Sequence, residues 1–137
     1  MNRRQFLSLS TAAIATPLLS QCSRSAPLRQ HLKSQDGLLE LELIAQAQVH
    51  RFAGQQATVL AYNGQMPGPI LEAETGDTVR LTLHNQLDQS TNLHYHGLHI
   101  SPEIDNVFRE VPAGERHTYE FQIPDDHPAV TCWYHPH

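Results

Sequence analysis

The stretch TVRLTLHN, residues 78–85, alternates polar and apolar side chains over its whole length. Because successive side chains of a β-strand point to opposite faces, this period of two predicts a strand whose inner face carries Val79, Leu81 and Leu83. Similar alternating or short apolar runs occur at residues 38–44, 57–62, 70–71, 93–100, 115–123 and 130–135. Turn-forming residues separate them, and no amphipathic helix of ordinary length follows residue 36. The sequence therefore predicts an all-β fold, a Greek-key β-sandwich or barrel.

Length and charge restrict the class of protein further. With 137 residues, the chain is long enough for one domain with a hydrophobic core and too short for two. The formal net charge is −5, and basic residues form no stripe apart from the pair Arg3 and Arg4. We therefore expect no nucleic-acid binding.

The first residues have the pattern of a targeting segment. Arg3 and Arg4 precede an apolar run at residues 7–19, which is too short to span a bilayer as an ordinary helix. We interpret residues 1–22 as a twin-arginine export signal, with an amphipathic or buried N-terminal helix as the alternative. Residues 23–36 are then a polar linker, and residues 37–137 form the domain, which we expect to be incomplete at its C-terminus.

The processing of this segment has two interpretations. The sequence around Cys22 resembles a lipoprotein box, in which Cys22 would carry a lipid anchor, but Gln21 stands where a small residue is expected. Alternatively, Ser23-Arg24-Ser25 offers an ordinary cleavage site between small residues. Either way, we expect a bacterial protein that is exported, either to the periplasm or lipid-anchored at the membrane surface.

Two pairs of histidines are the candidate metal ligands. His94 and His96 form one pair, His135 and His137 the other, and each pair has the spacing i, i+2. In a strand, residues at this spacing share one face, so two neighbouring strands would bring four imidazoles to one spot. One such pair alone could simply be polar strand residues. Together, the four predict half of a multinuclear metal centre.

The other histidines of the domain and Cys132 are not predicted to be metal ligands. His99 should point away from His96 and lie at the surface, because it follows at an odd spacing. His31, His50, His84, His117 and His127 are interpreted as surface or loop residues. Cys132 is expected to be a buried thiol rather than a copper ligand. Trp133 and Tyr134 should pack beside the metal site, and Asp125 with Asp126 should form a solvated turn.

The ordered motifs resemble the first cupredoxin domain of multicopper oxidases, the group of laccases, cuprous oxidases and bilirubin oxidases. The resemblance covers roughly residues 36–137 and is strongest to bacterial copper-tolerance cuprous oxidases. Its matching segments are Tyr62-Asn63-Gly64, Pro67-Gly68-Pro69, Gly76-Asp77-Thr78-Val79, Asn85-Gln86-Leu87, Leu93-His94-Tyr95-His96-Gly97-Leu98, Val111-Pro112-Ala113-Gly114 and Thr131-Cys132-Trp133-Tyr134-His135-Pro136-His137.

The resemblance implies a role for each ligand. His94 would bind a type 2 copper, His96 and His135 one copper of a type 3 pair, and His137 the other. The remaining ligands and the type 1 copper would come from a later cupredoxin domain, whose motifs do not occur in this sequence. Gly97 would leave room for that domain. After Asp105 the family usually has Gly; here Asn106 follows, and Asn tolerates left-handed backbone angles.

Two functions follow as expectations. The first is the copper-binding N-terminal fragment of a multicopper oxidase, which in its full form couples oxidation of cuprous ion or phenols to the reduction of dioxygen to water. Its partners would be copper ions, dioxygen, a reducing substrate and the missing cupredoxin domains. The alternative is a free-standing cupredoxin-like protein that sequesters copper, or zinc, without catalysis.

Overall fold

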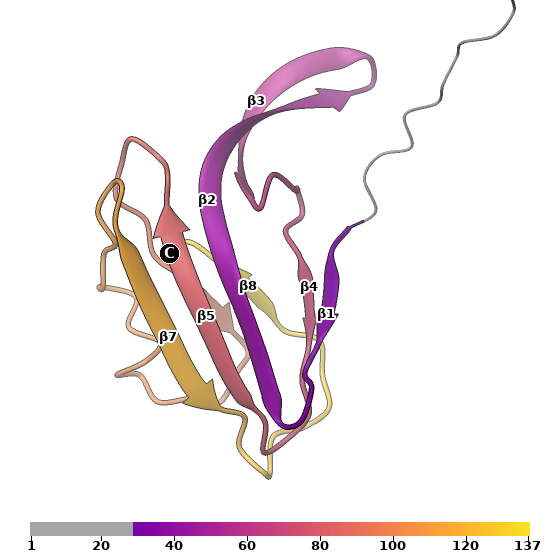
Figure 1. Ribbon diagram of the computed structural model, residues 1–137, viewed down its shortest axis with the longest axis vertical. Coiled ribbons are helices and arrows are strands. Elements are labelled where there is room, and N and C mark those ends of the chain that lie inside the picture. Colours follow the sequence, from indigo (N-terminus) through magenta and orange to yellow (C-terminus); the bar gives the residue numbers. More distant parts are fainter. Residues whose placement is uncertain (1–28) are drawn as a thin grey trace, which may run out of the picture.

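The computed structural model describes residues 29–137, so the expected export signal, Cys22 and residues 23–28 of the expected linker lie outside the described residues. Every regular element in this range is a strand, and none of these residues belongs to a helix that could cross a membrane. Figure 1 shows their arrangement, and the all-β class predicted from the sequence is confirmed. The strands are β1 (His31–Lys33), β2 (Leu38–Phe52), β3 (Gln55–Tyr62), β4 (Ile70–Glu72), β5 (Thr78–Asn85), β6 (His94–His96), β7 (Arg116–Gln122) and β8 (Trp133–His135).

The largest sheet has the strand order β3-β2-β5-β7. Strand β2 lies parallel to β5 over its first half and antiparallel to β3 over its second half. This double pairing extends β2 to Phe52, beyond the predicted end near Ile44. The far part of β2 and β3 therefore leaves the sheet as a curved hairpin, visible at the top of Figure 1. Ala53 and Gly54 both have positive φ at its turn, which suits a tight hairpin.

Two short ladders complete the fold. Strand β6 pairs antiparallel with β8, and β1 pairs parallel with β4. The β1 strand falls within residues 23–36, where the sequence predicted only a polar linker. Its register places His31 beside Ile70, and the backbone N–H of Ser34 extends the ladder by donating to the carbonyl of Glu72 at 2.9 Å. Such a short pairing is decided by contacts distant in sequence, which a stretch of three residues does not reveal.

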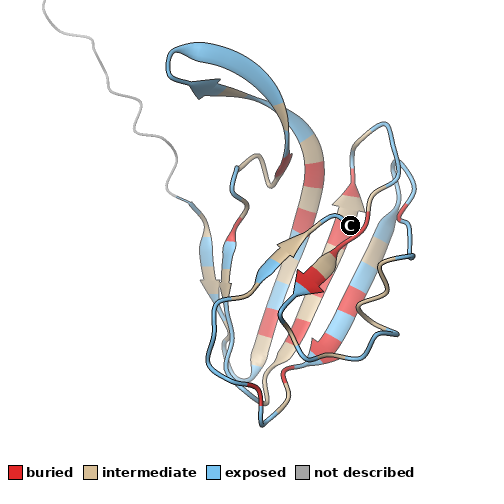
Figure 2. Cartoon of the chain, turned by 180° about the vertical axis from the view of Figure 1, so that it is seen from behind, coloured by how far each residue is buried: buried red, intermediate tan, exposed pale blue. Residues whose placement is uncertain are grey.

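The hydrophobic core lies between the large sheet and the β6–β8 ladder. Val79, Leu81 and Leu83 are buried on the inner face of β5, as predicted. From the opposite side Tyr95 of β6 packs edge-on against Tyr119 of β7, with ring centroids 5.8 Å apart. Figure 2 shows the resulting alternation of buried and exposed positions along the strands. The β6–β8 ladder is thus the second layer of a sandwich.

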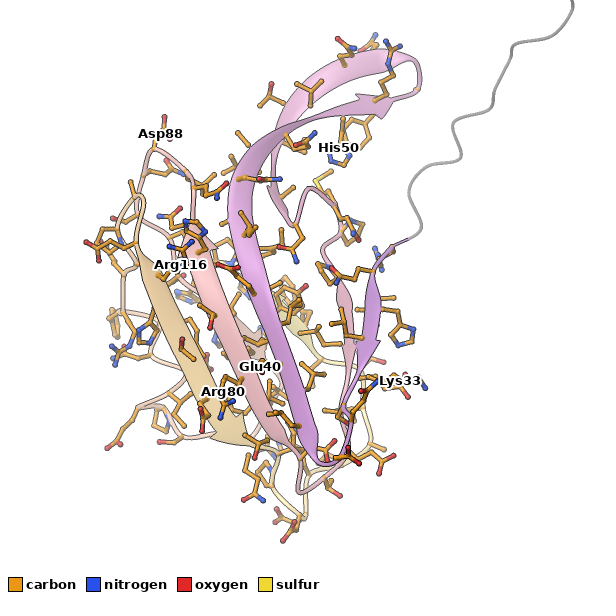
Figure 3. The ribbon with its side chains drawn as sticks, in the orientation of Figure 1. Lys33, Glu40, His50, Arg80, Asp88 and Arg116 are labelled. Carbon is orange, nitrogen blue, oxygen red and sulfur yellow. The ribbon has the colours of Figure 1, made fainter. Side chains whose placement is uncertain are left out.

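The outer face of the large sheet is charged. Arg80 of β5 donates to Glu120 of β7 at 2.7 Å and to Glu40 of β2 at 3.2 Å. Figure 3 labels Arg80 and Glu40 on this face. The neighbouring Arg80 guanidinium lowers the pKa of Glu120. Cross-strand ion pairs of this kind suit a face in contact with water.

Candidate metal centre

The register of β6 and β8 brings the two histidine pairs together. His94 lies opposite His135, and His96 lies opposite Trp133. Tyr95 and Tyr134 also oppose each other, and because side chains alternate along a strand, they occupy the other face. Tyr95 is buried in the core, whereas His96 is exposed. The ladder therefore has one core-facing side and one side that carries imidazoles and an indole.

Three of the four predicted ligands converge closely. His94, His96 and His135 each offer one ligand atom, and these atoms all lie within 4.8 Å of one another. His137 follows the end of β8, and its ring centroid lies 5.4 Å from that of His94 and 6.5 Å from that of His135. The structure thus brings together all four histidines singled out in the sequence, three of them in a tight group and His137 beside it.

Asp105 fixes the orientation of His94. Its Oδ1 accepts a hydrogen bond from Nδ1–H of His94 at 2.9 Å and a second from the backbone N–H of Tyr95 at 3.0 Å. A carboxylate on one ring nitrogen sets the tautomer, so Nε2 keeps its lone pair for a metal ion. In the sequence, Asp105 stood out only as the start of a shortened loop. Its contact with His94 could not be predicted, because it depends on how that loop folds back.

His135 is held in an equally defined position. Its Nδ1–H donates to the carbonyl of Pro136 at 2.7 Å, and the indole of Trp133 stacks on its ring with centroids 4.0 Å apart. Its Nε2 is buried and has no hydrogen-bond partner among the described residues. Buried polar atoms are rarely left unpaired, and His135 is one of the three converging histidines, so an unpaired nitrogen is available to a metal ion there. The donor set therefore fits a metal ion that prefers nitrogen ligands.

Asn92 anchors the fourth histidine. Its Oδ1 accepts the backbone N–H of His137 at 2.7 Å, and its Nδ2 donates to the carbonyl of Val107 at 2.7 Å. The side chain is buried, so these bonds connect the chain after β8 to the loop between β6 and β7. Asn92 was not singled out in the sequence. The sequence signal is an asparagine two residues before His94. This signal is weak, because only the fold shows that the amide is buried.

The structure changes three interpretations of residues around the site. Gly97 has φ +94°, and a Cβ there would lie 3.3 Å from Sγ of Cys132. The positive φ of this turn therefore favours glycine, and the side chain of Cys132 would have to shift for any larger residue. Cys132 itself is partly rather than fully buried, and it is not in the group of converging ligands. Asn106 has no positive φ; instead, its Oδ1 accepts the backbone N–H of Phe108 at 3.0 Å, which forms the turn.

The tyrosines behind the site are neutral groups. Burial raises the pKa of Tyr134 to about 12, and its hydroxyl donates to the carbonyl of Pro69 at 2.8 Å. Burial, followed by the neighbouring Tyr119, also raises the pKa of Tyr95. The side of the ladder opposite the histidines therefore carries no charge near neutral pH.

The remaining histidines of the domain lie outside the cluster. His99 is exposed, as expected. His127 lies in a loop as expected, but it is buried rather than at the surface. Those on other strands contact local partners, such as Glu72 for His31 and Gly64 for His50.

A β-sandwich whose short ladder carries three histidines on one side, with a fourth just after the ladder, defines a metal-binding domain of the cupredoxin-like class. The sequence model of the multicopper oxidase family matches residues 44–137 of the chain. The chain therefore belongs to the multicopper oxidase family, as the resemblance of its motifs implied.

Individual relatives agree with this assignment. The chain is 38% identical over 88 residues to copper resistance protein A of Pseudomonas syringae pv. tomato, covering 61% of this chain and 14% of the relative. It is 35% identical over 107 residues to multicopper oxidase mco of Staphylococcus epidermidis, covering 77% of this chain and 21% of the relative. A solved multicopper oxidase from Campylobacter jejuni, described as a metallo-oxidase, aligns with a TM-score of 0.69 at 30% identity, covering 81% of this chain and 26% of that chain. The chain thus spans about a quarter or less of the length of these proteins, and the cupredoxin-like fold is confirmed.

Proposed function

We propose that the chain is the copper-binding N-terminal domain of an exported multicopper oxidase and supplies half of the ligands of its three-copper cluster. The observation that carries the proposal is the convergence of His94, His96 and His135 within 4.8 Å, with His137 beside them. Imidazole suits copper, and copper binds such donors more tightly than the other divalent ions of its row. Copper bound there supplies the electron-transfer chemistry by which dioxygen is reduced to water.

The proposed assignment of each histidine to one of the three coppers follows the family pattern. In this proposal His94 holds the type 2 copper, His96 and His135 hold one type 3 copper, and His137 holds the other. Asp105 keeps His94 in one tautomer, and Trp133 with the carbonyl of Pro136 keeps His135 in one orientation. Because all of these groups sit on or beside a two-stranded ladder, the ligands are positioned before any ion binds.

The rest of the enzyme would complete the site. A hollow of about 360 Å³ opens beside the cluster and includes His137, Leu60 and Phe108 in its lining. Leu60 is 57% exposed and Phe108 is 90% exposed, so this side offers apolar surface to another domain. We propose that a further cupredoxin domain covers it and brings the remaining copper ligands and the type 1 copper. Cuprous ion or a phenol is the proposed reducing substrate.

The proposal is tested by titrating the chain with Cu²⁺ while following tryptophan fluorescence. Trp133 is the only tryptophan of the sequence. Its ring centroid lies 4.0 Å from that of His135 and 5.2 Å from that of His96. Copper held by these imidazoles should quench the emission in step with binding. Zinc has no redox chemistry and serves as the control ion; it should bind with little quenching. Copper binding that leaves Trp133 emission unchanged would place the ions elsewhere and refute the proposed site.

Asp105→Asn is expected to weaken copper binding by about 10–100-fold, the usual effect of removing the carboxylate behind a ligating histidine. The amide can present its NH₂ group to Nδ1 of His94, which favours the tautomer with the proton on the metal-facing nitrogen. Competition with a chelator of known affinity measures the loss. Asp88→Asn, an exposed aspartate in the turn after β5, is the matched control and should leave the affinity unchanged. Equal copper affinities for both variants would show that Asp105 does not support copper binding by His94.

Export is expected to depend on Arg3 and Arg4. Replacing both by lysine keeps the charge but removes the pair that the twin-arginine pathway reads. The precursor should then accumulate in the cytoplasm, which cell fractionation measures. An unchanged exported yield would show that residues 1–22 are another kind of segment. Cys22→Ser in the same assay distinguishes a lipid-anchored product from a freely periplasmic one.

A further inference from the structure

We propose a second transition-metal site, formed by His99 and His127 and separate from the four-histidine cluster. The two side chains come from the loops that follow β6 and β7. Their ring centroids lie 4.9 Å apart with an interplanar angle of 49°. Neither residue belongs to the group of His94, His96 and His135. This pair is therefore a second place where two imidazoles approach each other.

His127 has a free lone pair in a buried position. Only 8% of the residue is exposed, and its Nδ1–H donates to the carbonyl of Pro128 at 2.9 Å. This bond leaves the proton on Nδ1, so Nε2 is an acceptor. Nε2 is buried and has no hydrogen-bond partner in residues 29–137. Among the described histidines, only His127 and His135 have a buried Nε2 without a hydrogen-bond partner. His127 therefore offers an unpaired nitrogen in the same way as His135, which is a proposed copper ligand.

The separation of the rings suits two ligands of one ion. With metal–nitrogen bonds of about 2.0–2.1 Å, ring centroids this far apart correspond to a nitrogen–metal–nitrogen angle of roughly 100°. Tetrahedral and square-planar ions both accept neighbouring ligands near that angle. In the proposed cluster, His96 and His135 are the two histidines that share one copper, and their ring centroids lie 6.1 Å apart. The rings of His99 and His127 are therefore closer together than those of the pair proposed to share a copper.

The position of the pair also allows an ion to enter. His99 is exposed, so one ligand can meet the ion in solution while the other receives it below the surface. His127 is held by its own turn, in which its backbone N–H donates to the carbonyl of Pro124 at 3.0 Å. Water would complete the coordination sphere, because no third side-chain donor converges with this pair in the described part of the chain. The expected ligand is a first-row divalent ion, and Cu²⁺ should bind most tightly.

The test uses the full chain with the cluster removed by His94→Ala, His96→Ala, His135→Ala and His137→Ala. Titrated with Cu²⁺, this chain should still bind one ion, whose electron paramagnetic resonance spectrum shows coupling to two imidazole nitrogens. Adding His99→Ala or His127→Gln should weaken that binding at least tenfold. Adding His117→Ala, which removes an imidazole of β7 that packs against Tyr119, should not. No binding by the cluster-deleted chain, or equal binding by all three derivatives, would overturn the proposal.

A second measurement covers the case in which the cluster-deleted chain does not fold. In the otherwise unchanged protein, His99→Ala replaces an exposed residue and should preserve the circular dichroism spectrum. It should lower the copper stoichiometry by one ion while leaving the quenching of Trp133 by the first, cluster-bound copper intact. An unchanged stoichiometry would refute the second site without affecting the proposed function of the first.

Discussion

Replacing both His94 and His96 by alanine is expected to weaken copper binding at the cluster by more than about 100-fold. The loss should exceed the roughly 10–100-fold effect of removing a supporting residue, because two of the four nitrogen donors disappear outright. His135 and His137 would remain, but their ring centroids are 6.5 Å apart, the widest separation among the neighbouring pairs of the cluster. Copper retained against a competing chelator measures the affinity, and the circular dichroism spectrum verifies the fold.

The matched control removes the same number of imidazoles elsewhere. His31→Ala with His50→Ala changes two histidines that contact Glu72 and Gly64 and lie outside the cluster. Their loss should leave the affinity of the tightest copper site unchanged. A comparable weakening in both double variants would mean that copper binds to scattered surface histidines, and the register of β6 and β8 would then have no part in binding.

The second large effect concerns stability. Leu83→Ala is expected to lower the free energy of unfolding by about 2–5 kcal/mol, because it opens a cavity where the residue is fully buried. Leu83 belongs to the hydrophobic core between the large sheet and the β6–β8 ladder. Chemical denaturation followed by circular dichroism gives the change, provided that the slope with denaturant concentration stays the same.

Leu60→Ala is the matched control for this variant. It removes the same atoms from a leucine of β3 that is 57% exposed. A surface substitution of this kind should change the free energy of unfolding by less than about 0.5 kcal/mol. Equal losses for the two variants would contradict the assignment of β5 to the core and of β3 to the projecting hairpin.

Periodicity accounts for the parts of the structure that the sequence predicted. Strand β5 alternates polar and apolar residues without a break, and its three inner residues are buried as expected. The same rule placed His94 and His96 on one face, and the structure brings their rings within 5.7 Å. Spacing alone was sufficient here, because in a strand the direction of each side chain follows from its position.

The features that the sequence did not predict depend on distant contacts. Asp105 reaches His94 only because the chain after β6 folds back on a residue 11 positions earlier, and Asn92 binds a residue 45 positions away. The strand β1 exists through its pairing with β4, and β2 continues past Ile44 through its pairing with β3. His127 is buried by the loops around it rather than by a periodic pattern. None of these contacts leaves a local signature in residue order.

The ladder of β6 and β8 couples metal affinity to the integrity of the domain. Each strand contributes only three residues, and alternate residues serve the core and the cluster. A shift of one residue in this register would turn the tyrosines outward and the histidines inward, so a metal ion that holds the imidazoles together also opposes that slip. At a free copper concentration 100 times the dissociation constant, binding would add about 2.7 kcal/mol to the free energy of unfolding. Copper supply would thereby raise the folded fraction of the domain as well as the occupancy of its site.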